Sequence, residues 1–410
     1  MMTRQTLRSL APATAAFGLA ACLAAPARAD SPPAGSWMSG IKLSAQFEGG
    51  VTFNLADPKT NFGQLFTDHA NQATLNQALF TMQRQIDPKQ TGWDVGFKLQ
   101  GLYGSDARYT HFLGELDRSI STRYQLDIVE ANVTLHMPVL TPGGIDLKIG
   151  QFPTPLGYET IDPSTNPFYS HSYIFNFGLP LKHTGGLAVV HASPVVDLYL
   201  GLDTGVNTSF GSGDNNSAPA GIVGANFTLL GGNLTILALA HIGPENPSTV
   251  VPNANNYMRY YNDIVITYKA SDKLTLTTEL NYIRDDFFKA DGGGVAQYAQ
   301  YALNDTLTLN GRAEVWADGK GFYVGAFPGN LDAVNAQLGN PNTSYGTGRA
   351  TTYGALTLGV TYKPALPAPV SGLLIRPELR YDTALNNVKP FNGGRDRGAF
   401  TIASDFVLGF

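Results

Sequence analysis

The chain has 410 residues, with 27 Lys and Arg against 32 Asp and Glu, a formal net charge of −5 and a single cysteine. This acidic balance argues against nucleic acid as a partner. Only 14% of the residues are charged, whereas about a quarter is usual in soluble domains. The mean hydropathy is nevertheless close to zero, which fits strands in which apolar and polar residues alternate.

The first 29 residues predict a secretory signal peptide. Arg4 and Arg8 precede an uncharged, Ala-rich stretch, and Ala27-Arg28-Ala29 matches a small-residue cleavage site. The stretch is too short and too weakly apolar for a membrane anchor. An alternative is a lipobox ending at Cys22, but the residues after Cys22 stay apolar, which disfavours it. Cleavage leaves 30–40 as a short periplasmic N-terminal segment and a mature chain without cysteine.

Sixteen segments predict β-strands, because apolar and polar residues alternate in them and turn residues separate them. The predicted strands are 41–53, 73–86, 92–104, 122–136, 144–152, 183–192, 195–205, 219–230, 233–243, 257–270, 273–285, 294–304, 306–317, 350–363, 372–383 and 397–409. Short and long connections alternate between them. The main long connections are 54–72, 105–121, 153–182, 318–349 and 384–396.

An even number of strands, with short turns at one end and long loops at the other, predicts an all-β fold. We expect a transmembrane antiparallel β-barrel of about sixteen strands over 41–410, with short periplasmic turns, long extracellular loops and both chain ends in the periplasm. A soluble β-sandwich would not need its loops segregated by length, and a propeller would repeat every four strands.

The predicted strands have two chemically different faces. In 306–317, Leu309 and Val315 are expected to face lipid, and Arg312 and Glu314 the interior. Buried charges are costly in a dry core but not in water, so these residues predict a water-filled lumen. The charged residues assigned to the pore lining are Lys42, Glu48, Lys98, Lys148, Glu279, Arg312, Glu314, Arg376, Glu378, Arg380 and Asp382. Ion pairing that only stiffens the wall is the alternative.

Over the whole predicted inner face, acids outnumber bases once Asp94, Glu130, Asp146 and Asp405 are added. This excess predicts a weak preference for cations. The opposite preference is expected if Arg376 and Arg380 stand at the narrowest point, because two fixed charges there would outweigh a diffuse excess elsewhere.

The connection 153–182 is the candidate constriction loop. It holds six aromatic residues, and a long loop that apolar is expected to pack against a surface, of which the lumen wall is the nearest. A lid on the outer rim and a contact between subunits are the alternatives. The residues assigned to the constriction are Tyr158, Glu159, Asp162, Phe168, Tyr169, His171, Tyr173 and Lys182.

The last strand alternates as well, and its apolar face ends on the terminal residue Phe410. This ending resembles the C-terminal strand of outer-membrane barrels, which the assembly machinery recognises. Aromatic residues near predicted strand ends favour interfacial girdles. These aromatics are Trp93, Tyr124, Tyr268, Tyr282, Tyr362 and Phe410.

Three segments carry a family resemblance. Gly150-Gln-Phe-Pro-Thr-Pro-Leu-Gly-Tyr-Glu159, Asn166-Pro-Phe-Tyr-Ser-His-Ser-Tyr173 and His183-Thr-Gly-Gly186 resemble the OmpL-like β-barrel porin family. The resemblance covers roughly residue 40 to the C-terminus. It implies an outer-membrane channel in a Gram-negative bacterium and carries over no binding residue.

Catalytic and metal-binding patterns are weak. None of the seven histidines forms an H-E-x-x-H pattern, and although His171 and His183 flank the aromatic loop and could meet, we expect no metal and no cofactor. Ser170 and His171 are adjacent, so their side chains are expected to point apart. Gly292-Gly293-Gly294 is expected to be a loop.

The sequence therefore predicts a porin for passive diffusion of small hydrophilic solutes or ions. An outer-membrane barrel enzyme and a secreted all-β binding protein are the alternatives. The expected partners are outer-membrane lipids and lipopolysaccharide, the barrel assembly machinery through Phe410, and the solutes themselves. A homotrimer and a monomer are both compatible with the sequence.

Overall fold

The computed structural model describes residues 36–87, 91–117, 122–324 and 348–410. The predicted signal peptide, the lipobox alternative at Cys22 and most of the predicted loop 318–349 lie outside these residues. The chain divides into a short unit, Met1–Ile41, and a large unit, Lys42–Phe410. In the short unit, the 3-10 helix η1 (Trp37–Gly40) is capped by Ser36, whose Oγ accepts a hydrogen bond from the Ser39 amide at 3.3 Å.

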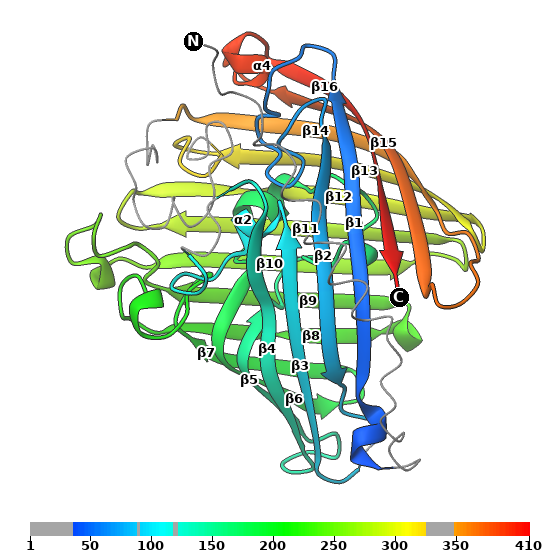
Figure 1. Ribbon diagram of the computed structural model, residues 1–410. Helices are drawn as coiled ribbons and strands as arrows, with labels where there is room; N and C mark the ends of the chain where they lie inside the picture. The colour runs from blue at the N-terminus through cyan, green and yellow to red at the C-terminus, as the bar shows by residue number, and fades with distance from the viewer. Residues whose placement is uncertain (1–35, 88–90, 118–121, 325–347) are drawn as a thin grey trace, which may run out of the picture. The chain divides into compact units, whose positions relative to one another are not determined.

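The large unit is a closed barrel of sixteen antiparallel strands, as predicted, in which each strand pairs with its neighbours in sequence and β1 pairs with β16 (Figure 1). The strands are β1 (Lys42–Asn54), β2 (Ala73–Arg84), β3 (Asp94–Gly104), β4 (Gln125–Met137), β5 (Ile145–Pro153), β6 (Lys182–Ser193), β7 (Val196–Asp203), β8 (Ala220–Leu229), β9 (Leu234–Gly243), β10 (Arg259–Lys269), β11 (Leu274–Asp285), β12 (Ala290–Asn304), β13 (Leu307–Asp318), β14 (Thr351–Tyr362), β15 (Gly372–Ala384) and β16 (Gly398–Gly409).

Among the described residues, no helix is long and apolar enough to cross a membrane. The helical elements of the barrel unit are short and lie in its connections. They are α2 (Ala107–Thr110), η2 (Pro163–Thr165), the π-helical turn η3 (Ile174–Gly178), η4 (Gly211–Gly213), η5 (Leu230–Gly232), η6 (Ala254–Asn256) and α4 (Phe391–Gly394).

The prediction that Gly292-Gly293-Gly294 is a loop is wrong, because β12 begins at Ala290 and contains all three glycines. A side chain on Gly294 would come within 2.0 Å of the Val315 carbonyl oxygen, and one on Gly293 within 2.5 Å of the Asn281 carbonyl oxygen. The three glycines therefore mark close backbone packing between strands rather than a chain break.

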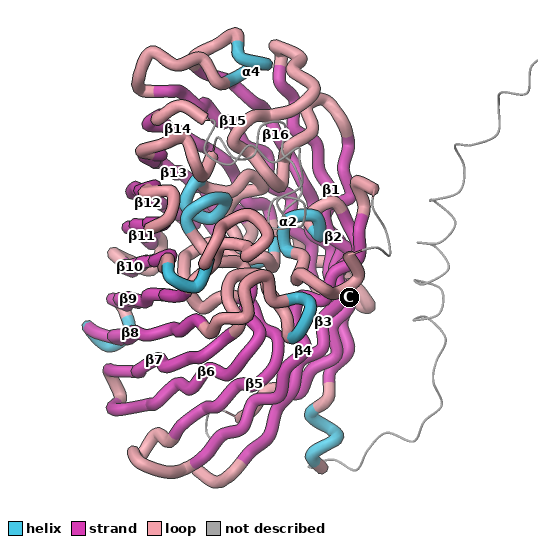
Figure 2. Tube along the Cα trace, turned by 90° about the vertical axis from the view of Figure 1, so that its left-hand side faces the viewer, coloured by secondary structure: helices cyan, strands magenta, loops and turns pink. Residues whose placement is uncertain are grey.

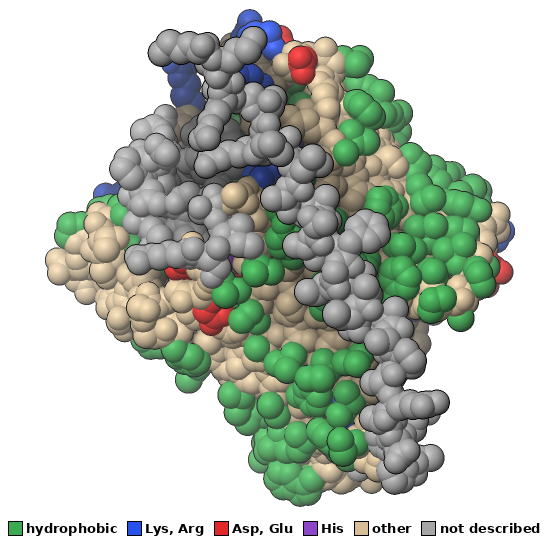
Figure 3. Space-filling view, viewed as in Figure 1, with side chains coloured by type: hydrophobic (Ala, Val, Ile, Leu, Met, Phe, Trp, Pro, Cys, Tyr) green, Lys and Arg blue, Asp and Glu red, His purple; other side chains and the backbone are tan. Residues whose placement is uncertain are grey.

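The predicted alternation of faces holds along the strands. On β13, Leu309 and Val315 are 42% and 43% exposed, whereas Arg312 and Glu314 are 1% and 5% exposed. Hydrophobic side chains cover broad areas of the outer wall in Figure 3. Such a wall buries its polar backbone in the sheet and presents apolar side chains to lipid, which is the requirement for spanning a membrane with strands.

Closure of the barrel involves the last residue. The Phe410 amide donates to the Ala45 carbonyl oxygen at 2.8 Å, and the Ala45 amide donates back to Phe410 at 3.2 Å. The Phe410 ring meets Phe47 edge-on, with centroids 6.1 Å apart, and Phe47 meets Phe80 in the same way. The terminal aromatic residue therefore continues the pairing of β16 with β1, and its ring packs on β1.

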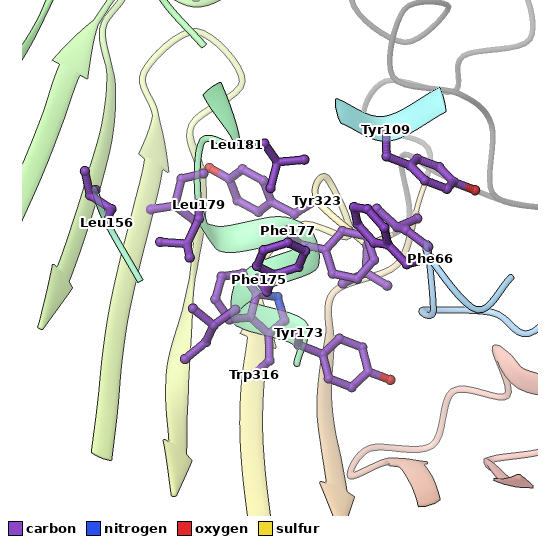
Figure 4. Packing of buried hydrophobic residues seen from close by; sticks show 14 of the residues in the cluster. Phe66, Tyr109, Leu156, Tyr173, Phe175, Phe177, Leu179, Leu181, Trp316 and Tyr323 are labelled. Carbon is purple, nitrogen blue, oxygen red and sulfur yellow. The ribbon is translucent and has the colours of Figure 1, made fainter. Parts of the chain in front are cut away.

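Connections occupy the interior of the ring of strands, as Figure 2 shows. The main apolar cluster is built there, from aromatic residues of the connections and inward side chains of the wall (Figure 4). The barrel is thus partly filled, and the filling decides where solutes can pass.

Candidate functional site

The connection 153–182 lies against the inner wall of the barrel. Its η3 turn contributes the buried rings of Phe175 and Phe177, and Tyr173 precedes it (Figure 4). Tyr173 stacks on Tyr353 of β14 at a centroid distance of 5.1 Å. The turn sits over Trp316, close enough that a side chain at Gly178 would come within 2.7 Å of the indole ring. The aromatic residues of this loop therefore find their apolar surface inside the barrel.

Carboxylates of the wall accept hydrogen bonds from the main chain of the loop. Glu314 accepts from the Tyr173 amide at 2.7 Å, and Glu378 accepts from the Tyr169 amide at 2.9 Å. Glu279 accepts from the Tyr158 amide at 3.0 Å. An irregular loop has few internal partners for its amides, so these charged acceptors satisfy groups that burial would otherwise leave unpaired.

Arginines of the wall donate to the carbonyl oxygens of the same loop. Arg312 donates to Ser170 at 2.8 Å, and Arg380 donates to His171 at 2.6 Å. Arg376 donates to the carbonyl oxygens of residues 163 and 166 at 2.6 and 2.7 Å. Strands β13 and β15 thus hold the loop through both its donors and its acceptors.

The same arginines are paired with carboxylates. Arg312 lies 2.7 Å from Glu159 and 3.2 Å from Glu314. Arg380 lies 2.7 Å from Asp382 and 3.5 Å from Glu314, and Arg376 contacts Glu48 and Asp405. The three arginines are about 1% exposed, because the loop covers them. Loop carbonyls and carboxylates surround them, where the sequence predicted open water.

Glu159 is the loop residue with the most charged contacts. Burial raises the pKa of its carboxyl, but Arg312, His171 and the Ser172 amide outweigh burial and bring the pKa down to about 2. His171 Nδ1 lies 2.9 Å from Glu159, and Tyr298 donates to the same carboxylate at 3.1 Å. Glu159 is therefore an anion buried in the middle of the loop–wall contact.

The other predicted loop residues are distributed as follows. Asp162 caps η2 and accepts from Gln46 of β1 at 2.9 Å, and Phe168 lies under the Arg312 guanidinium at 5.1 Å. Tyr158 donates to a glutamine of β12, and burial raises its pKa to about 12. Lys182 lies elsewhere: it is paired with Asp127 of β4 and sits 3.9 Å above the ring of Phe112.

Two further connections help to fill the barrel, and sequence reasoning did not find their charged residues. Arg108 of α2 forms a two-point pair with Asp68 at 2.8 and 2.9 Å, and Asp106 accepts from Asn76 and Gln77 of β2 at 3.0 Å. These charges lie in irregular connections, where no alternation marks the inward direction. The length of the connections was the only sequence feature that pointed to these residues.

A polar cavity of about 470 Å³ lies on the opposite side, along the inner face of β2 to β7. Lys98 and Lys148, two of the predicted pore-lining residues, line it. Glu130 pairs with Lys98 at 2.5 Å. The remaining lining residues are Gln83, Arg84, Gln85, Ile86, Phe97, Asn132, Thr134, Asp146, Pro155, Leu187, Val189 and Tyr199. Of the other predicted pore-lining residues, Lys42 is exposed at the start of β1, whereas Glu48 further along β1 and those on β11, β13 and β15 are buried.

The histidines do not pair as the sequence allowed. His171 stacks on Phe175 at 4.0 Å and contacts Glu159, whereas the His183 ring lies 4.7 Å from the ring of His241. Ser170 Oγ accepts from Arg312 at 3.2 Å, so among the described contacts it has no histidine partner.

Several solved structures share this architecture. The channel DcaP of Acinetobacter baumannii matches at 12% identity and a TM-score of 0.54, over 90% of this chain and 97% of that one. OprB of Pseudomonas putida matches at 14% identity and 0.52, over 90% and 94%. An anion-selective porin from Comamonas acidovorans matches at 10% identity and 0.55, over 90% and 99%. At these identities the likeness shows the fold alone.

No curated protein sequence matches the chain. The family model described as "Putative beta-barrel porin-2, OmpL-like" matches residues 40–410. Because this match spans nearly the whole chain, the protein belongs to this OmpL-like family of outer-membrane β-barrel porins.

Proposed function

We propose that this outer-membrane porin passes small hydrophilic solutes and ions by passive diffusion, through the part of the barrel that loop 153–182 leaves open. The observation that carries the proposal is the asymmetry of the interior. The main chain of the loop is hydrogen-bonded mainly to β11, β13 and β15, with further contacts to β1 and β2, whereas the cavity of about 470 Å³ lies along β2 to β7 and reaches the loop at Pro155. Loop 153–182 then acts as the constriction, and the path follows the opposite wall.

The lining of the cavity suits small polar solutes of either sign. Lys98 is matched by Glu130, Arg84 by Asp94, and Lys148 shares the cavity with Asp146. The arginines that would have favoured anions are buried with carboxylates under the loop. A balanced, wet lining screens charges over about 8 Å at physiological salt, so we expect weak selectivity rather than exclusion of one sign.

A cysteine scan of the barrel tests the path. The predicted mature chain has no cysteine, so Lys148→Cys would provide a single reactive thiol in the cavity. A bulky, membrane-impermeant thiol reagent should then lower single-channel conductance. Leu309→Cys, on the lipid face of β13, is the matched control and should not respond. Equal, full conductance of both labelled variants would contradict the proposed path.

We propose further that the protein has no catalytic activity and that its partners are lipids and lipopolysaccharide at the apolar outer wall and the assembly machinery at Phe410. The support is the match to a porin family and the position of Phe410 in the closing seam. Its mass in detergent would distinguish a single barrel from a homotrimer.

A further inference from the structure

Four buried polar side chains meet at the long-loop end of the barrel, outside the network that holds loop 153–182. They are His183 at the start of β6, Asp203 at the end of β7, His241 near the end of β9, and Glu245 just beyond it. Their exposed fractions are 0%, 5%, 0% and 5%. These residues are up to 62 positions apart in the sequence, and the register of neighbouring strands brings them together. Asp203 of β7 pairs with a residue of β8, and His241 of β9 pairs with a nearby residue of the same strand.

One atom of each side chain in this cluster is buried without a hydrogen-bond partner. These atoms are His183 Nδ1, Asp203 Oδ2, His241 Nδ1 and Glu245 Oε1. Buried polar atoms are nearly always hydrogen-bonded, so four unpaired atoms in one place indicate that a bonding partner is missing. His183 Nδ1 and Asp203 Oδ2 are 3.5 Å apart, too far for a good hydrogen bond. Two ligands bound at about 2.0–2.2 Å to one tetrahedral metal ion stand at nearly this separation.

We propose that His183, Asp203 and His241 bind one divalent transition-metal ion of the zinc class. Each offers a ligand atom, and these atoms all lie within 4.8 Å of one another. His241 Nε2 already lies 3.0 Å from the Asp203 carboxylate, so an ion would replace that hydrogen bond. Two imidazoles and one carboxylate suit zinc and its neighbours rather than calcium or magnesium, which prefer oxygen ligands. Three protein ligands leave a fourth position for water or a small solute.

The surroundings support both histidines as ligands. His183 Nε2 lies 3.0 Å from Thr154 Oγ1, so its second nitrogen has an acceptor. His241 Nδ1 faces Glu245 Oε1 at 3.7 Å, and the other Glu245 oxygen accepts from the Val206 amide at 2.8 Å. Metal-binding imidazoles usually donate their second nitrogen to such a group, which fixes the ring. The two carboxylates also match the charge of a divalent ion.

A second cluster of two histidines and two carboxylates in the barrel is held by hydrogen bonds among its own members. His136 Nδ1 lies 2.6 Å from Asp146, and His191 lies 3.2 Å from Asp146 and 2.7 Å from Asp197. Both nitrogens of His191 are hydrogen-bonded to carboxylates, and no atom of these four residues is among the buried orphans. His191 therefore provides a matched control.

The test is metal binding by the full chain, folded in detergent and stripped with a chelator. Competition with a chromophoric chelator should give one tight Zn²⁺ per wild-type barrel. His241→Gln and Asp203→Asn should each weaken binding by more than about 100-fold, and Glu245→Gln by about 10- to 100-fold, as for outer partners of metal ligands. His191→Gln should bind as wild type does. Heat-modifiable migration identifies the folded variants.

Co²⁺ provides a second readout that does not depend on any variant. Bound to the wild-type barrel, it should give the visible bands of a four-coordinate nitrogen and oxygen site, without a thiolate charge-transfer band. The proposal is overturned if folded wild-type protein binds no Zn²⁺, or if folded His241→Gln binds as tightly as wild type.

Discussion

Arg380 of β15 donates a hydrogen bond of 2.6 Å to the main-chain carbonyl oxygen of His171, 209 residues earlier in the chain. The same guanidinium pairs with Asp382 and Glu314. One wall residue therefore fixes the loop position and neutralises its own charge. This relationship explains how a channel wall rich in arginine can present little positive charge to the pore.

Removing the Arg380 side-chain charge should release the loop without unfolding the barrel. Arg380→Met leaves Asp382 without its ion-pair partner and Glu314 paired with Arg312 alone, and breaking a buried pair in this way costs about 3–5 kcal/mol. We expect faster hydrogen exchange at the amides of Tyr169 to Tyr173 and noisier single-channel currents. Arg397→Met, at an exposed site just before β16, is the control and should change neither. Unchanged exchange in Arg380→Met would show that the loop is held by its aromatic residues alone.

Acid should loosen the loop through Glu159. Its pKa is about 2 in the folded protein against an ordinary value of 4.5. A lowered pKa stabilises the folded state fully above about pH 4.5, and this stability is lost as the pH falls toward 2, an effect on the order of 3 kcal/mol. Current noise of the wild-type channel should therefore grow between these pH values. Glu159→Gln should show the noise at neutral pH and respond less to acid. An identical pH profile in both proteins would exclude Glu159 as the cause.

Charge changes in the cavity should shift ion selectivity. Lys98→Gln removes a positive charge and leaves Glu130, so the reversal potential in a KCl gradient should move toward cation preference. Glu130→Gln should move it toward anions. The shift should be small at high salt because of screening. Lys363→Gln, in the exposed turn after β14, is the control. If both cavity variants keep the wild-type reversal potential, the ions follow another route.

Loss of the terminal aromatic residue should impair assembly in the outer membrane. Phe410→Ala removes the ring that packs on Phe47, while the backbone pairing with Ala45 can remain. We expect a lower surface level and less heat-modifiable protein. Phe400→Ala, on the same face of β16 and 43% exposed, is the control and should assemble. Normal assembly of Phe410→Ala would contradict a role of Phe410 in recognition.

Much of the fold could be predicted from the sequence because strand alternation is local. The two faces of β13 and β15 follow from the alternation of apolar and polar side chains in adjacent residues, and turn residues separate the strands. The Gly292 to Gly294 stretch was misread because glycine signals a turn and a close strand packing equally well. Local rules could not tell these apart without the neighbouring strands.

The site was predicted less completely because it depends on contacts between distant segments. Alternation places Arg312 on the inner face, but only the folded loop determines that it meets Glu159 rather than water. The cluster of His183, Asp203 and His241 has no sequence pattern, since its residues lie on three different strands. Their meeting depends on barrel register, which the spacing of single histidines does not encode.

The most direct test of the account is the single-channel conductance of a barrel in which residues 158–177 are replaced by a short Gly/Ser linker. If the loop narrows the pore, the conductance should rise about twofold or more, because it follows the open cross-section, while the barrel stays heat-modifiable. An unchanged conductance in a folded barrel would contradict the account, because the loop would then not limit the path.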